Sequence, residues 1–196
     1  MAVGTGYSLP VVALYSASGN TVTYSNFLSL GRGVDISLDV EVSDVNNFYA
    51  DNKVAETAGG VFTKGTGTAT VDGLSNAAAK LILGLPETRT VTVGGESVSV
   101  QGYTGDEAPF VGLGYIYRQQ MNGVVSYIAT VLPKVKFNQP SKSAATQEED
   151  IDWQTQELTF SIFRDDTAAG EWMSESATPF ATEDAAYAFL QEVLGS

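Results

Sequence analysis

Residues 34–42, VDISLDVEV, alternate strictly between aliphatic and polar side chains. Successive side chains of an extended chain point to opposite faces, so the aliphatic residues of this segment share one face. The other face carries Asp35, Asp39 and Glu41, together with Ser37. The pattern predicts a β-strand with one buried face and one hydrated, acidic face.

Strand chemistry recurs along most of the chain. Two short alternating runs flank Gly94-Gly95 within residues 90–100, which is a strong hairpin signal. Met121-Asn122-Gly123 joins two long runs, and Pro133 in the second run predicts an edge strand or a bulge. The further strands are predicted at residues 20–30, 61–72, 110–118, 123–137 and 151–163.

Two segments have helical spacing instead. The first follows Ser75 or Asn76 as N-cap and ends at Gly84 and Pro86. The second covers residues 182–194, where Thr182 is the expected cap and an apolar stripe follows. Together the elements predict a mainly β fold in one domain over residues 1–196: an antiparallel β-sandwich or partial barrel with one flanking helix and a C-terminal helix.

Two segments are predicted to be loops. Residues 44–60 lose the alternation, and we interpret them as a long loop with at most a short strand inside. Loops of this length in a compact domain usually have a function, and the aromatic pair Phe48 and Tyr49 would be unusual in a merely solvated loop. Residues 138–150 form a polar loop with an acidic end.

Composition excludes several functions. The chain has no Cys and no His, so disulfides, zinc–thiolate sites and the Ser-His-Asp and Cys-His catalytic arrangements are excluded. Glycoside hydrolysis by a pair of carboxylates stays open. The formal net charge of −13 disfavours a surface that grips nucleic-acid phosphates. The same charge suits either plain solubility or repulsion of a polyanion.

No localisation signal and no ligand motif is persuasive. The N-terminus has neither a basic region nor an apolar core typical of export, and no run reaches the length of a membrane span. Residues 111–115, VGLGY, lack the third glycine and the helix of a nucleotide loop, so close packing in a strand explains these glycines better. The acidic cluster Glu148, Glu149, Asp150 and Asp152 lacks calcium-loop spacing and is interpreted as solvated. No catalytic, cofactor-binding or metal-ligating residue is therefore assigned, and no cofactor is expected.

Several segments taken together resemble a known family. The acidic strand leads into DVNNFYADNKVAE, then FTKGTGTATVDGL and a short helix. A long strand pair follows and ends in LPKVKFNQPSKSAATQEEDIDWQTQELTFSIF, with Gly-Glu-Trp after the last strand. The chain is similar, over about residues 11–173, to the phi13-type major tail proteins of siphophages. Residues 133–163 are the most specific stretch of this resemblance.

The resemblance implies a fold, a function and partners. Family members are β-sandwiches with a flanking helix, related to the tube subunits of type VI secretion systems. They form homohexameric rings that stack head to tail, and their inner sheets join edge to edge around a channel. The expected partners are further copies of the chain, a tape measure protein, a tail terminator and distal tail proteins. DNA would pass through without specific binding, and the protein would be assembled in the bacterial host cytoplasm and end in the virion tail.

Two hypotheses about residues follow from this comparison. Asp35, Asp39 and Glu41 are expected to face the lumen of the tube. Phe48 and Tyr49 are expected to anchor contacts between rings or subunits. The alternatives are a secretion-type tube protein or, from a different class, a β-sandwich carbohydrate-binding module or carboxylate glycosidase, which would show clusters of exposed aromatic residues on one face.

Overall fold

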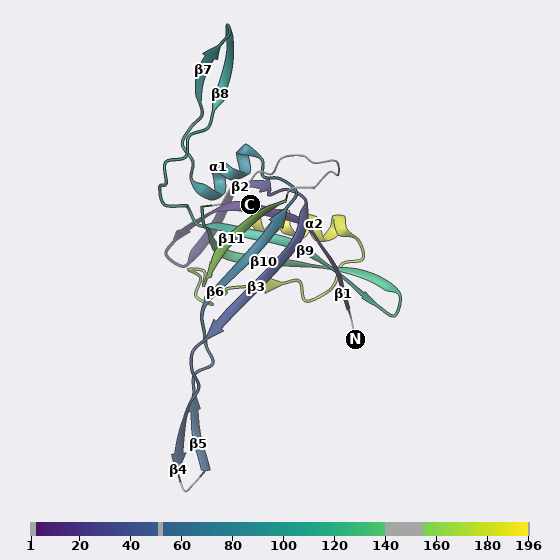
Figure 1. Cartoon of the computed structure of the whole chain (residues 1–196). Helices are drawn as coiled ribbons and strands as arrows, with labels where there is room; N and C mark the ends of the chain where they lie inside the picture. Colours follow the sequence, from purple (N-terminus) through teal and green to yellow (C-terminus); the bar gives the residue numbers. More distant parts are fainter. Residues whose placement is uncertain (1–2, 51–52, 140–154, 196) are drawn as a thin grey trace, which may run out of the picture.

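The computed structural model describes residues 3–50, 53–139 and 155–195, and this part of the chain is dominated by antiparallel strands (Figure 1). The strands are β1 (Val3–Ser18), β2 (Thr21–Ser29), β3 (Gly33–Val42), β4 (Asn46–Ala50), β5 (Lys53–Ala58), β6 (Phe62–Val71), β7 (Arg89–Val93), β8 (Glu96–Val100), β9 (Val111–Met121), β10 (Val124–Phe137), β11 (Gln156–Phe163) and β12 (Ser174–Glu175). The helices are α1 (Asn76–Leu83) and α2 (Glu183–Leu194). The predicted mainly β fold with one internal and one C-terminal helix is confirmed.

One sheet of eight strands forms the body of the molecule. Its order is β2-β1-β9-β10-β11-β6-β3, and β12 pairs with β10 beside this path. The hairpins β4–β5 and β7–β8 are separate two-stranded sheets. They project from opposite ends of the body, as Figure 1 shows.

The sheet folds over on itself at β10. The first part of β10 pairs with β9, whereas Lys134–Phe137 pair with β11, and the register shifts between Leu132 and Val135. Pro133 lies within this register shift, which confirms the predicted bulge. Proline has no N–H to donate to a neighbouring strand, so it is tolerated where the regular pairing is interrupted. In Figure 1 the strands β3, β6 and β11 cross β1, β9 and β10 steeply, which gives two packed layers.

The main core lies between these two layers. Its largest fully buried side chains include Phe160 from β11 and Leu113 and Leu132 from the other layer. Burying each such side chain stabilises the fold by about 1.5–3 kcal/mol. The helix α1 closes this core and begins as predicted, since Ser75 Oγ accepts a hydrogen bond from the N–H of Ala78 at 3.1 Å.

A second core lies between α2 and the outer face of β1, β9 and β10. The helix presents Ala186, Leu190 and Leu194, all fully buried. A Cβ at Gly112 would lie 2.7 Å from a methyl carbon of Leu194, and one at Gly114 would lie 2.9 Å from the other methyl. The glycines of VGLGY therefore serve close helix–sheet packing, as the sequence indicated.

The terminal strand β3 approaches the other half of the sheet without pairing with it. The strand β3 is the last in the sheet order, yet it lies against β1. A side chain at Gly33 would collide with the ring of Tyr7 in β1. The fold is therefore an incompletely closed barrel, as expected from the sequence.

Two predictions need correction. Residues 44–60 are not an irregular loop but mostly the paired strands β4 and β5, because Asn and Ala residues that weaken the alternation still pair across a hairpin. On β3, Val34 and Val42 are 53% and 58% exposed rather than buried. They lie at the ends of an edge strand, where register shifts interrupt its pairing with β6. Most of the predicted 138–150 loop and residues 151–154 of the last predicted strand lie outside the described residues.

Candidate assembly surface

The outer face of the β3–β6–β11 layer is a sheet surface on which no described helix packs. In the part of the chain that the structure describes, neither helix makes more than marginal contact with these three strands. Residues directly opposite each other on antiparallel strands lie on the same face, so the register sorts the residues of this surface into rows across the three strands. In one row Asp35 lies opposite Thr70, and Thr70 lies opposite Glu157. We call this surface the bare face; its residues are Asp35, Ser37, Asp39, Glu41, Lys64, Thr66, Thr68, Thr70, Glu157, Thr159 and Ser161.

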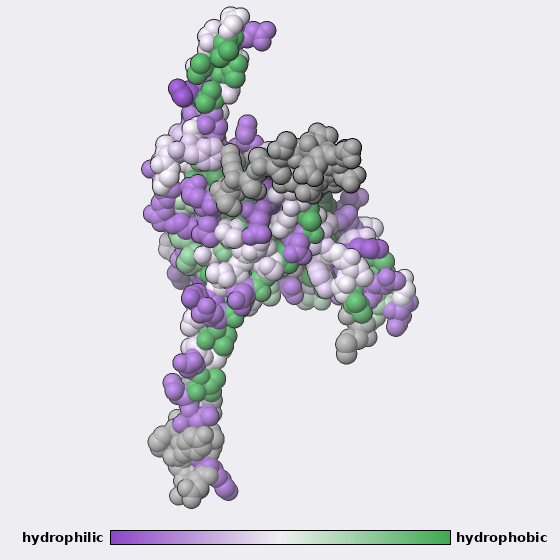
Figure 2. Space-filling view, in the orientation of Figure 1, coloured by the Kyte–Doolittle hydropathy of each residue, from purple (hydrophilic) through white to green (hydrophobic). Residues whose placement is uncertain are grey.

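The bare face is hydrated rather than apolar. Hydroxyl groups of Thr and Ser form its centre, and Figure 2 shows mostly polar colouring over β3 and β6. Asp35, Asp39 and Glu41 are all exposed on it, so the predicted acidic face of the strand is confirmed. A face of this kind offers no anchor for a hydrophobic partner, and it presents no aromatic side chain in its three central rows.

The charge of the bare face is not uniform. Glu41 Oε1 lies 3.2 Å from Lys64 Nζ, and both side chains are mostly exposed. Further along the same face, Lys134 and Lys136 of β10 pair with carboxylates outside it, Asp166 and Glu107. Among the described residues, the carboxylates of this face that belong to no ion pair are Asp35, Asp39 and Glu157.

The bare face ends at one free strand edge. The strand β3 is terminal in the sheet order, so one of its sides has no paired strand in the described part of the chain, whereas β11 at the other margin pairs with β10. Such edges are templates for pairing with another chain unless they are protected. The charges on β3 sit at the margin of the bare face beside its free edge.

Phe48 and Tyr49 lie elsewhere. Both belong to β4, where Phe48 pairs with Glu56 and Tyr49 pairs with Val54. The β4–β5 hairpin carries them away from the body, as Figure 1 shows, so the structure does not bring them together with Asp35, Asp39 and Glu41.

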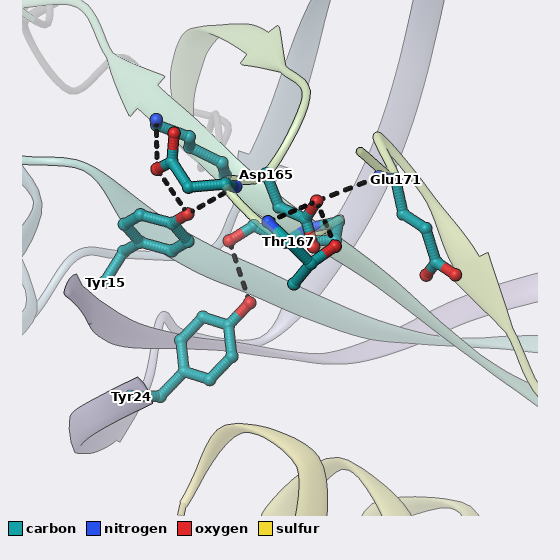
Figure 3. A network of polar contacts seen from close by, with 8 residues as sticks. Tyr15, Tyr24, Asp165, Thr167 and Glu171 are labelled. Atoms are coloured by element: carbon teal, nitrogen blue, oxygen red, sulfur yellow. Dashed lines mark hydrogen bonds and ion pairs between the residues drawn. The ribbon is translucent and has the colours of Figure 1, made fainter. Parts of the chain in front are cut away.

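A polar network joins three segments that are distant in the chain (Figure 3). Tyr15 of β1 donates its hydroxyl to Asp166 Oδ2 at 2.7 Å, and the N–H of Asp166 donates back to the same hydroxyl at 2.9 Å. Lys134 Nζ lies 2.7 Å from Asp166 Oδ2 and 5.2 Å from the centre of the Tyr15 ring. Hydrogen bonding to Lys134, and then to Tyr15, lowers the pKa of Asp166. Burial, reinforced by the bond to Asp166, raises the pKa of Tyr15 to about 12.

The loop that carries Asp166 is held by its own turn. Asp165 Oδ1 accepts hydrogen bonds from Thr167 Oγ1 at 2.8 Å and from the N–H of Glu171 at 2.9 Å. Nearby, the Tyr24 hydroxyl donates to the carbonyl of Pro133 at 3.1 Å. These bonds fasten β1 and β2 to β10 and to the loop after β11, and we interpret the network as structural. Sequence inspection missed it because its members are far apart in the chain.

The described acidic residues form no metal-binding cluster. Within residues 3–50, 53–139 and 155–195, no group of three or more acidic residues is placed to hold a metal ion. The acidic cluster Glu148, Glu149, Asp150 and Asp152 lies outside the described residues. No described helix is long and apolar enough to cross a lipid bilayer.

Comparison with protein-family models and with curated proteins found no match to this chain.

Proposed function

We propose that this chain is a self-assembling structural subunit that forms a tube. More specifically, we propose a tail tube protein of a long, non-contractile-tailed bacteriophage, stacking as hexameric rings into the channel for DNA ejection. The observation that carries the proposal is the bare face: a hydrated, hydroxyl- and carboxylate-bearing sheet surface that ends in the free edge of β3. The resemblance of residues 11–173 to siphophage tail proteins supports the same function.

The physical argument concerns what a channel wall needs. A wall made from edge-paired sheets satisfies the backbone groups of every free strand edge once the ring closes. A wall that lets DNA slide must hydrate well and avoid clustered positive charge, because phosphate binding is driven by Lys and Arg. The bare face has this chemistry at its β3 side, so we assign it to the lumen in this proposal.

The other class of function is less well supported. A carbohydrate-binding face usually stacks sugars on exposed aromatic rings, and the central rows of the bare face have none. Phe163, which follows Ser161 on the same side of β11, is 39% exposed and packs edge-on against Phe110 with ring centres 5.4 Å apart.

The test is the assembly state of the full-length protein. Sedimentation across a range of concentrations should show large assemblies, and negative-stain microscopy should show rings or tubes with a central channel. A nucleating tail-tip complex should be supplied in a parallel sample, since tubes of this kind often need an initiator. A monomer in both samples, with no ordered polymer, would contradict the proposal.

A further inference from the structure

The β7–β8 hairpin is amphipathic. In its register Val91 lies opposite Val98, and Arg89 lies opposite Val100. Directly opposed residues and residues two apart share a face of a hairpin. One face therefore collects the aliphatic side chains Val91, Val93, Val98 and Val100, which we call the valine face; Arg89 lies at its base and Glu96 beside the turn on the same face. The other face carries Thr90, Thr92, Ser97 and Ser99.

Nothing in the described chain covers the valine face. The strands β7 and β8 pair with each other and make at most marginal contacts with any other element. Val93 and Val98 are 62% and 47% exposed. An isolated two-stranded hairpin is marginally stable in water, and exposed aliphatic rows usually mark a contact with another molecule.

A second group of exposed valines lies at the opposite end of the body. Val42, Val45 and Val61 surround the stem of the β4–β5 hairpin, each more than half exposed. The N–H of Ser43 donates to the carbonyl of Val61 at 2.8 Å, so the two chain segments of this valine stem lie side by side. Figure 2 shows aliphatic residues on both projections, at opposite ends of the molecule.

We propose that the valine face of β7–β8 packs on the valine stem of β4–β5 in a second copy of this chain. Both surfaces are small, aliphatic and strand-like, and burying each against the other removes apolar area from water. Because they lie at opposite ends, one contact leaves a free surface of each kind, so the contact propagates head to tail rather than closing a pair. The inference rests on the proposed self-assembly and names the axial contact between successive rings.

Cross-linking tests the pairing directly. The chain contains no Cys, so the variants Val91→Cys and Val45→Cys each carry a single thiol. A mixture of the two, treated with a short bismaleimide, should give a heterodimer, whereas each variant alone should give little product. The double variant should give a ladder of linked chains. Predominant Val91–Val91 linkage would overturn the head-to-tail contact in favour of a face-to-face pair.

The outcomes separate this inference from the proposed function. If tubes form but no cross-linked heterodimer is found, the valine contact is overturned and the proposed tube function stands. If the heterodimer and the ladder of linked chains form but no rings or tubes are seen, the valine contact is supported and the proposed tube function is contradicted. Absence of both would contradict both.

Substitution gives an independent measurement. The double variant Val91→Thr/Val98→Thr keeps β-branched residues, so the hairpin should persist while its face becomes polar. We expect the concentration needed for assembly to rise by roughly tenfold or more, as expected for lost apolar burial at each contact. The control Thr90→Ser/Thr92→Ser changes the opposite face and should leave this concentration nearly unchanged. If both variants required the same concentration for assembly, the proposed valine contact would be overturned.

Discussion

At the scale of residues, the best-defined polar contact is the one between Tyr15, Lys134 and Asp166. Asp166 accepts hydrogen bonds from both partners, and Lys134 also lies 4.7 Å from the centre of the Phe110 ring. The carboxylate is partly exposed, so solvent screens its interaction with Lys134. We therefore expect a modest contribution to stability that depends on pH.

The variant Asp166→Asn tests this contribution. The folded pKa of Asp166 lies below its unfolded value of about 4, so the stabilisation is fully present above that pH and is lost as pH falls through the folded pKa. Urea unfolding at pH 7 should show a loss of less than about 1 kcal/mol. The difference from the parent protein should disappear at strongly acidic pH. The control Glu192→Gln removes an exposed carboxylate from α2; if it lost stability with the same pH dependence, the contact would not be the cause.

At the scale of elements, the hairpins β4–β5 and β7–β8 differ from the body in being separate two-stranded sheets. The β4–β5 hairpin continues the direction of β3 and β6 beyond the sheet, as Figure 1 shows. Ordering a projecting segment of this length costs conformational entropy, and a contact with another molecule can offset that cost. We expect that contact to form with another subunit.

The double variant Phe48→Ser/Tyr49→Ser tests the role of the hairpin. The body should fold as before, with an unchanged unfolding midpoint, because both residues belong to the β4–β5 hairpin, which is a sheet separate from that of the body. Tube growth should be blocked, as measured by sedimentation and microscopy. The control Ala188→Ser/Gln191→Ser alters the exposed side of α2 and should assemble normally. Normal tubes from the aromatic double variant would make residues 138–150 the next candidate for the stacking contact.

At the scale of the whole molecule, the bare face raises the question of what its charge does in a tube. Each charge acts over only about 8 Å at physiological salt, so an effect on DNA requires many charges close to the wall. Repetition around a ring of subunits would supply them. Asp35 and Asp39 contribute most, since Glu41 is paired with Lys64.

Changing Asp35, Asp39 and Glu41 together to Lys tests the lumen hypothesis. Strand alternation is preserved, so tubes should still form, with a loss of less than about 1 kcal/mol from the exposed Glu41–Lys64 pair. These tubes should retain DNA and lower infectivity. The control changes the exposed residues Glu87, Asp106 and Glu192 to Lys, which alters the net charge equally and breaks the Lys80–Glu87 pair. Equal DNA retention in both variants, or a tube structure with the three side chains on its outer surface, would contradict the hypothesis.

The sequence alone determined the features that depend on neighbouring residues. The strand β3 with its acidic face, the Thr182 cap and the Gly94-Gly95 turn were predicted correctly, and Ser75 is the cap among the two predicted candidates, Ser75 and Asn76. Local hydrogen bonds and backbone preferences decide these features. Both turn glycines, for example, have positive φ angles of 63° and 91°, as a tight hairpin requires.

Only the tertiary structure decided which surfaces are covered. The pairing of Lys134 with Asp166, the contact of α2 with Gly112 and Gly114, and the bare outer face of β3 depend on strands distant in the chain. Val34 and Val42 follow the same alternation as Ile36 and Leu38, yet they are exposed because β3 is the sheet's last strand and the core ends beneath its middle. Periodicity specifies the side of a strand on which a residue lies, whereas the order of strands and the packing of helices decide whether anything lies on that side.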